Sequence, residues 1–133
     1  MNIPEELRYS SEHEWVRTEA DTATVGITDY AQDQLGDIVY VDLPATGASV
    51  TQLEKMGEIE SVKAVSDLFS PVSGEVVEVN QEAVGSPELV NEEPYGRGWL
   101  VKVRLSDAGE IDKLLSAQAY DELITREMEE NTD

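Results

Sequence analysis

The residue whose type and setting could most readily do chemistry is Lys63. It lies within Glu58–Asp67 (Glu-Ile-Glu-Ser-Val-Lys-Ala-Val-Ser-Asp), where two strand-like runs meet at a tight turn predicted for Lys63-Ala64-Val65. A turn tip is exposed, and exposure is what an enzyme that modifies a lysine needs. Because Val62 and Ala64 are small and uncharged, they leave room for such an enzyme. The setting therefore favours a lysine that bears an attached group.

Most lysines at hairpin tips only keep a protein soluble, so the surroundings of Lys63 matter. Gly47 lies sixteen residues before Lys63, and Gly74 lies eleven residues after it. Glycine fits where a chain turns sharply or packs close to another backbone. With these glycines on both sides, attachment of a group at Lys63 becomes the stronger interpretation.

The rest of the chain offers little other chemistry. It contains no cysteine, which excludes disulfides, thiolate metal sites and a cysteine nucleophile, so any thiol chemistry must come from an attached group. The sequence has no nucleophile with a base partner, no phosphate-binding loop and no metal-ligand cluster, and His13 is its single histidine. We therefore expect a carrier without catalytic residues rather than a stand-alone enzyme.

Acidic residues dominate the charge: 29 Asp and Glu stand against 9 Lys and Arg, for a net charge of -20. This charge excludes nucleic acid as a partner, because the phosphates would be repelled. A hydrophobic content of 40% in regular patterns argues for a folded protein and against a disordered acidic one. A halophilic source is our hypothesis for the acid excess, since strong salt screens surface repulsion. A basic partner surface is the compatible alternative.

The sequence carries no recognisable targeting signal. Residues 1–10 include Pro4, Glu5 and Glu6 and have no apolar run, which argues against a signal peptide. No window approaches the roughly 20 apolar residues of a membrane-spanning helix. We expect a protein that has no membrane partner and works in the cytoplasm.

Short strands with turn signals between them account for most of the chain. Thr28 is expected to cap a short helix that ends at Gly36. The strands are expected at Glu14–Arg17, Thr22–Ile27, Asp37–Leu43, Glu58–Lys63, Ser66–Ser70, Gly74–Asn80 and Trp99–Leu105. The large aromatic residues expected in the core or in a cleft wall are Trp15, Tyr40, Phe69 and Trp99.

Helices are expected to follow the last strand. Asp107 and Glu110 have the spacing of a capping box for a short helix that includes Leu115. Ser116 can cap a second helix, which presents one apolar face and frays over 129–133.

Together these elements predict a mainly β fold: a flattened barrel or sandwich of two antiparallel sheets, with short peripheral helices and C-terminal helices. Since no linker-like stretch divides the chain, residues 1–133 are expected to form one domain. Its core is expected at about 20–105 and its helical segment at about 107–130.

Several stretches, in one order along the chain, make the sequence similar to a known family. The stretches are His13-Glu14-Trp15-Val16, Val25–Gln32, Gln34–Val39, Glu60-Ser61-Val62-Lys63-Ala64, Ser66-Asp67, Ser70–Val76, Asn80, Pro87–Asn91, Pro94-Tyr95-Gly96 and Gly98-Trp99-Leu100. From about Arg8 to Ile124 the sequence resembles the H proteins of the glycine cleavage system. The resemblance implies a barrel like that of lipoyl and biotinyl carriers.

The resemblance also implies that Lys63 carries lipoic acid in an amide bond, attached by a lipoate ligase or lipoyl transferase. In the family, the lipoyl group accepts an aminomethyl group from glycine at a pyridoxal-phosphate glycine decarboxylase. It delivers that group to a tetrahydrofolate-dependent aminomethyltransferase, ammonia is released, and dihydrolipoyl dehydrogenase reoxidises the dithiol. The chain would be a carrier subunit and would supply no catalytic residue.

In the family the loaded arm can fold back into a cleft on the carrier, which shields its amine from water. Glu14 and Asp67 match positions that contact this amine, and carboxylates suit a cation. The neighbouring His13 is a further candidate for the cleft. Glu12 stands where some relatives have a small polar serine, so the contact at that position would differ here.

Three alternative carriers can be weighed against this one. A lipoyl domain of a 2-oxoacid dehydrogenase is usually shorter and tethered by linkers. A biotin carrier usually has methionines on both sides of its lysine, where this chain has Val62 and Ala64. A lipoyl relay protein, which would donate its lipoyl group to 2-oxoacid dehydrogenases, is compatible with the sequence and stays open.

Overall fold

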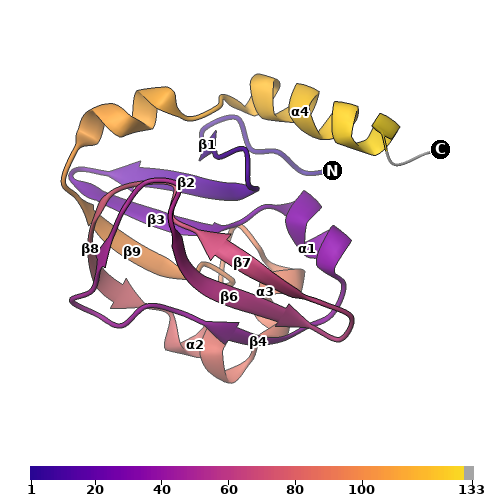
Figure 1. Ribbon diagram of the computed structural model, residues 1–133, viewed down its shortest axis with the longest axis horizontal. Helices are drawn as coiled ribbons and strands as arrows, with labels where there is room; N and C mark the ends of the chain where they lie inside the picture. The colour runs from indigo at the N-terminus through magenta and orange to yellow at the C-terminus, as the bar shows by residue number, and fades with distance from the viewer. Residues whose placement is uncertain (131–133) are drawn as a thin grey trace.

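Two antiparallel sheets frame the molecule in the computed structural model, which describes residues 1–130 (Figure 1). The six-stranded sheet has the order β1-β2-β3-β9-β8-β5, and the three-stranded sheet has the order β4-β6-β7. The larger sheet comprises β1 (Arg8–Tyr9), β2 (Glu14–Glu19), β3 (Thr22–Ile27), β9 (Val101–Leu105), β8 (Gly74–Val79) and β5 (Ser49–Val50). The smaller comprises β4 (Ile38–Asp42), β6 (Lys55–Ser61) and β7 (Val65–Phe69). The mainly β prediction is confirmed.

The strands β1 and β2 extend the larger sheet toward the N-terminus. Arg8 pairs with Val16, and Glu14 pairs with Ile27. The sequence predicts a core that begins at about residue 20. Both strands precede this residue, and both are hydrogen-bonded into the same sheet as β3.

Short helices close the ends and edges of the two sheets. They are α1 (Asp29–Leu35), α2 (Gln81–Gly85), α3 (Glu88–Glu92), the 3-10 helix η1 (Ala108–Lys113) and α4 (Ala117–Glu130). The helices α2 and α3 lie against β4, and α4 runs across the molecule beside β1 (Figure 1). The fraying predicted for 129–133 falls partly on residues 131–133, which lie outside the described part of the chain. Within residues 1–130 no helix is long and apolar enough to cross a bilayer.

The predicted caps of α1 and α4 are confirmed. Thr28 Oγ1 accepts a hydrogen bond from Ala31 N at 3.2 Å, and Gly36 ends α1 with a φ of +78°. Ser116 Oγ accepts from Ala119 N at 3.2 Å at the start of α4. In each case the side chain satisfies a backbone N–H that the first helical turn leaves unpaired.

The capping box predicted at Asp107 and Glu110 is confirmed for Asp107, which caps a short helix, and wrong for Glu110. The Asp107 carboxylate accepts from Gly109 N at 3.0 Å, but Glu110 accepts from Ser73 N at 2.7 Å and Ser73 Oγ at 2.8 Å. Glu110 is thus engaged in a tertiary contact with Ser73, and the helix that forms here is a 3-10 helix over Ala108–Lys113. Leu115 lies beyond it and pairs with Tyr9.

The core consists of connected apolar clusters. One fills the larger sheet, with Val25, Val76 and Val103 fully buried. A second lies between the sheets, and the partly buried Met56 packs against both clusters. The third joins Trp15 to Tyr120 of α4, so the N-terminal strands and α4 are packed together.

The prediction of a buried position is right for Trp15 and wrong for Tyr40. Trp15 has no exposed surface, whereas the Tyr40 side chain on β4 is 51% exposed. An alternating strand pattern does not say which face of a sheet is covered. Here Tyr40 lies on the face of the smaller sheet that the rest of the chain leaves open.

Candidate functional site

The turn between β6 and β7 presents Lys63 at one end of the smaller sheet. Ser61 closes the turn: Ser61 N donates to Ala64 O at 2.8 Å, and Ser61 Oγ accepts from Ala64 N at 3.1 Å. Val62 N donates to Asp37 O at 3.0 Å, which ties the turn to the residue before β4. The predicted hairpin is confirmed, with its turn one residue earlier than expected because Val65 already belongs to β7.

Four lysines can be compared, and only Lys63 combines an exposed amine free of ion pairs with a place on a hairpin turn, since Lys113, which is also exposed and makes no ion pair within residues 1–130, ends the 3-10 helix η1. Lys63 is exposed and makes no ion pair within residues 1–130. Lys55 Nζ lies 2.8 Å from Glu58 and 3.2 Å from Asp67, and these carboxylates raise the pKa of Lys55. Lys102 Nζ lies 3.7 Å from Glu78 and over the Trp99 ring. An unpaired amine on an exposed turn fits an amide-linked acyl group, because its acylation breaks no existing contact.

Gly36, at the end of α1, lies beside the lysine stem. A Cβ placed on Gly36 would be 3.6 Å from Lys63 Cε, which is ordinary van der Waals contact. The positive φ of Gly36, rather than lack of space, is therefore what favours glycine there.

Glu14 is a buried carboxyl at the start of β2, with a side chain only 1% exposed. Ser10 Oγ donates to Glu14 Oε1 at 2.5 Å, and Phe69 N of β7 donates to Glu14 Oε2 at 3.3 Å. No lysine, arginine or histidine forms an ion pair with it among the described residues. Burial raises the pKa of Glu14 to about 8, although the hydrogen bonds from Ser10 and Phe69 act in the opposite direction. A cationic amine would supply the partner that this carboxyl lacks when it is ionised.

Ser10 is the residue of this region that the sequence did not single out. Its hydroxyl accepts from Glu12 N at 3.2 Å and from Glu14 N at 3.1 Å while it donates to the Glu14 carboxyl. It is 2% exposed and so is buried with Glu14. The only sequence signal was a serine four residues before an acid, which is typical of many turns.

His13 is turned toward α4. Its Nδ1 lies 2.9 Å from the Tyr120 hydroxyl, and its Nε2 lies 3.1 Å from Glu127. Burial lowers the pKa of His13, and the nearby Glu127 opposes that shift. With a φ of +74°, His13 takes a left-handed backbone conformation that a non-glycine residue adopts only when its surroundings hold it.

Tyr120 joins this contact to the rest of the turn. Its hydroxyl is also 2.6 Å from Thr28 Oγ1, and its ring stacks on Tyr9 with centroids 4.7 Å apart. His13 O in turn accepts from Thr28 N at 3.1 Å. The helix α4 thus holds the Ser10–Glu14 turn from one side while β7 contacts it from the other.

Glu14 on β2 reaches the strand that carries Asp67, but the structure does not join the two side chains. Glu14 bonds the backbone of Phe69 on β7, and Asp67, two residues earlier on β7, pairs with Lys55 at 3.2 Å. Glu12 is exposed at the turn beside them. No hydrogen bond or ion pair connects Glu12, His13, Glu14 or Asp67 to Lys63 within the part of the chain described.

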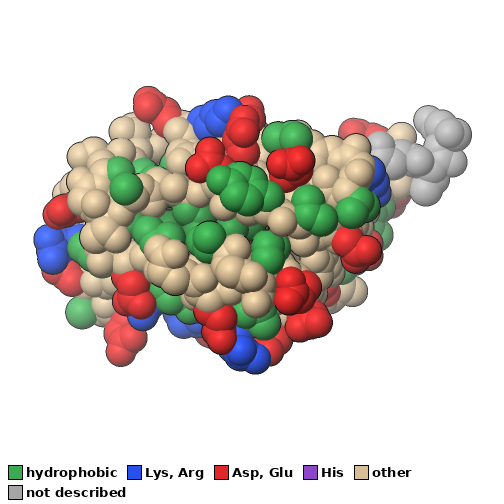
Figure 2. All heavy atoms as spheres, turned by 90° about the horizontal axis from the view of Figure 1, so that it is seen from below, with side chains coloured by type: hydrophobic (Ala, Val, Ile, Leu, Met, Phe, Trp, Pro, Cys, Tyr) green, Lys and Arg blue, Asp and Glu red, His purple; other side chains and the backbone are tan. Residues whose placement is uncertain are grey.

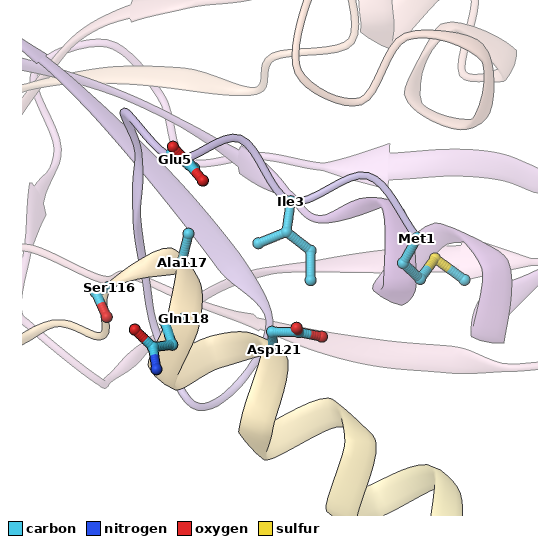
Figure 3. A pocket seen from close by; sticks show the side chains of 7 residues that line it. All are labelled: Met1, Ile3, Glu5, Ser116, Ala117, Gln118 and Asp121. Atoms are coloured by element: carbon cyan, nitrogen blue, oxygen red, sulfur yellow. The ribbon is translucent and has the colours of Figure 1, made fainter.

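A separate groove of about 630 Å³ lies between the N-terminal segment and the beginning of α4 (Figure 3). Its lining residues are Met1, Ile3, Glu5, Ser116, Ala117, Gln118 and Asp121. Since neither Lys63 nor Glu14 lines it, this groove is not part of the predicted site.

Comparisons with known proteins agree on one family. The family described as "Glycine cleavage H-protein" matches residues 7–127. The chain is 57% identical over 124 residues to the glycine cleavage system H protein of Staphylococcus carnosus, covering 93% of this chain and 98% of the relative. It is 56% identical over 124 residues to the H protein of a Geobacillus species, with the same coverage.

A solved structure is similar as well. The crystal structure of a glycine cleavage system H protein from Mycobacterium marinum matches with a TM-score of 0.86 at 40% identity. The match covers 92% of this chain and 99% of that one, so it includes both sheets and the helices around them. With the family match and this level of identity over nearly its whole length, the chain belongs to the glycine cleavage H-protein family.

Proposed function

We propose that Lys63 is the residue that carries lipoic acid, and that the loaded chain moves an aminomethyl group between enzymes of the glycine cleavage system in the cytoplasm. The chain is a member of the H-protein family, whose members carry covalently attached lipoate as carrier subunits of that system. The observation that carries the assignment is the exposed, unpaired amine of Lys63 on the β6–β7 turn. When bound, the group would supply the disulfide that accepts the aminomethyl group.

The residues of the chain would hold and shield the amine of a loaded arm. We propose that Glu14, oriented by Ser10, accepts the amine, since it is a buried carboxyl without a cation. Asp67 adds a second carboxylate from β7, at present paired with Lys55. His13, the residue before Glu14, is held in place by its contact with Tyr120, and the exposed Glu12 adds negative potential at the rim.

The partners follow from the system to which the family belongs. We propose that they are a pyridoxal-phosphate glycine decarboxylase, a tetrahydrofolate-dependent aminomethyltransferase and dihydrolipoyl dehydrogenase, with a lipoate ligase or lipoyl transferase acting first. A tethered group reaches successive active sites at high effective concentration, which explains why a carrier needs no catalytic acid or base. We further propose that residues 1–133 act as one domain, supported by the packing of α4 on the N-terminal strands.

Intact mass spectrometry tests the assignment of Lys63. Co-expression with a lipoate ligase should add the mass of one lipoyl group, and Lys63→Ala should remove that increase completely. Peptide mapping should locate the group at residue 63, and modification of Lys55 or Lys102 instead would overturn the assignment. In cells that lack the chain, glycine cleavage alone should fail. Loss of lipoylation on the 2-oxoacid dehydrogenases would favour the relay function.

A further inference from the structure

Exposed apolar side chains cluster around Lys63. Within residues 1–130 seven large apolar side chains are exposed, and four of them lie near the β6–β7 turn: Val39 at 49%, Tyr40 at 51%, Val62 at 70% and Val65 at 61%. We call these four residues the tip patch. A cluster of exposed apolar side chains on a protein that otherwise buries its own marks a surface that another molecule covers.

The strand register sets the arrangement of the patch. Tyr40 pairs with Glu60, and Glu60 pairs with Val65, so these three side chains lie in one row on the same face of the sheet. The next row, Val41-Ile59-Ser66, points to the opposite face, where Val41 and Ile59 are buried. The row of Tyr40, Glu60 and Val65 is therefore on the outer face, where two exposed apolar side chains flank one exposed acid, and the lysine turn follows directly from it.

A row of acids lies on the same outer face, one step further from the turn. Asp42 pairs with Glu58, and Glu58 pairs with Asp67. Like charges directly opposite one another across strands destabilise a sheet. Lys55 offsets part of this repulsion, because it contacts Glu58 and Asp67, but it makes no ion pair with Asp42. The outer face thus combines apolar surface near Lys63 with a surplus of negative charge beyond it, which complements a partner with an apolar contact and a basic rim.

The apolar surface continues past Tyr40. A groove between β4 and α2 is lined by Tyr40, Leu43, Pro44, Val79 and Val84 among others. Figure 2, which views the molecule from the side of β4 and α2, shows apolar side chains gathered in the middle of this face with acidic side chains around its margin. The partner could therefore extend its contact along β4.

The length of the unmodified lysine side chain determines which partner must contact the tip patch. The bare side chain is a stem of only four carbons, so an enzyme that acts on its amine must bring its own surface against the residues around the turn. Enzymes that use the loaded arm meet a group held further from the turn, and they do not need this contact. The occupant that the geometry requires is the enzyme that attaches the lipoyl group.

We infer that the outer face of β4-β6-β7, formed by the tip patch and the Asp42-Glu58-Asp67 row, is the docking surface for this lipoyl-attaching enzyme. The inference rests on the proposed lipoylation of Lys63. In the reaction, the Lys63 ammonium loses one proton, Nζ bonds to the acyl carbon of an activated lipoyl donor, and the bond from that carbon to its phosphate or thiol activating group breaks. The nitrogen then loses a second proton as the amide forms, and no electrons are exchanged with an oxidant.

Lipoylation rates of purified full-length variants, followed by intact mass with a purified lipoate ligase, test this docking surface. Tyr40→Thr/Val65→Thr keeps two strand-forming residues but removes the two apolar side chains that flank Glu60, and it should lower kcat/KM about tenfold, mainly through a higher KM. Asp42→Lys should raise KM several-fold at low salt and weaken the salt dependence of the rate.

Matched controls carry equal changes elsewhere. Leu53→Asn removes an exposed apolar side chain at a position whose φ of +66° asparagine tolerates, and Glu122→Lys reverses one exposed acid on α4. Both should be lipoylated at the wild-type rate. Urea unfolding of each variant separates a docking defect from a folding defect.

Three outcomes are distinguishable. If the wild-type chain is not lipoylated at Lys63, the proposed function fails. If the wild-type chain is lipoylated and the Tyr40/Val65 variant proceeds at the same rate, the docking surface is wrong. The variant can also be lipoylated by long incubation and then assayed with dihydrolipoyl dehydrogenase. If its lipoyl group is reoxidised about tenfold more slowly than that of the wild type, the surface contacts other partner enzymes as well, and its assignment to the attaching enzyme is overturned.

Discussion

The β6–β7 turn and the Ser10–Glu14 turn are both built on short hairpins, yet their surroundings are opposite. The β6–β7 turn is held by Ser61 and by one bond to Asp37 O, and its Lys63 side chain is exposed. The Ser10–Glu14 turn is packed between β7 and α4, and its Glu14 side chain is 1% exposed. The β6–β7 turn exposes its lysine to other proteins, whereas the Ser10–Glu14 turn excludes water from its carboxyl.

This contrast separates two tasks within one small chain: carrying a group to other proteins and holding that group's amine. A residue that must enter several active sites gains from having few contacts of its own, because each contact would have to be broken. A carboxyl that is to hold a cation gains from exclusion of water, which strengthens the interaction. That exclusion has a cost in stability while no cation is present, since the charged form of Glu14 is desolvated.

Lys63→Arg gives the largest expected effect and tests whether the exposed turn is a purely functional region. Lipoylation and glycine cleavage should be lost completely, because a guanidinium does not form the amide although its charge is kept. The free energy of unfolding should change by less than about 0.5 kcal/mol, as is usual for exposed positions. Intact mass and urea unfolding measure the two quantities. A large loss of stability would show that the two turns differ less than described.

Glu14→Gln should give the largest effect on stability. The folded pKa of Glu14, about 8, lies above its unfolded value, so its contribution to stability is complete below the unfolded pKa and is lost as pH rises through about 8. Relative to the wild type, the glutamine variant should therefore gain stability between pH 5 and pH 9, by roughly 4 kcal/mol from the pKa difference.

Urea unfolding across this pH range measures the effect in both proteins. Asp67→Asn serves as the exposed control, and its stability relative to wild type should not rise over the same interval. If Glu14→Gln and the wild type show parallel pH dependence, Glu14 is not the desolvated carboxyl described here.

Two tyrosines offer a smaller test of the same contrast. Tyr120→Phe removes the hydroxyl shared by His13 and Thr28 and should cost about 1–2 kcal/mol, because both partners are left with an unmet hydrogen bond. Tyr40→Phe, on the open face of β4, should change stability by less than about 0.5 kcal/mol. Thermal and urea unfolding measure both variants. If Tyr120→Phe and Tyr40→Phe lower stability equally, the view that α4 supports the Ser10–Glu14 turn is contradicted.

The concentration of salt should have the smallest effect on stability per residue. It should act only on the repulsion among exposed acids. With a net charge of -20, the thermal midpoint should rise by a few degrees from low salt to about 1 M salt, where the Debye length is about 3 Å. The pH dependence contributed by Glu14 should persist, since buried charges are screened little. An unchanged midpoint in low-salt buffer would remove the support for the hypothesis of a halophilic source.

Much of the fold could be predicted from local patterns. The caps at Thr28 and Ser116 and the hairpin around Lys63 follow from residue types at fixed spacings, which act within a few residues of one another. The failures have two causes. Glu110 left its expected cap for Ser73, thirty-seven residues away, and no local pattern reports such a partner. The short helices α2 and α3 were missed because each spans only five residues.

The sequence alone determined which residue could bear a group, since a lysine between small neighbours on a tight turn is a local property, and it determined the family through motifs in a fixed order. It did not determine how the acids differ from one another. It is the packing of the folded chain that buries Glu14 against Phe69, pairs Asp67 with Lys55 and leaves Tyr40 exposed. The reason is physical: burial, and with it the pKa of a carboxyl or the openness of a sheet face, depends on which distant segments pack against a residue.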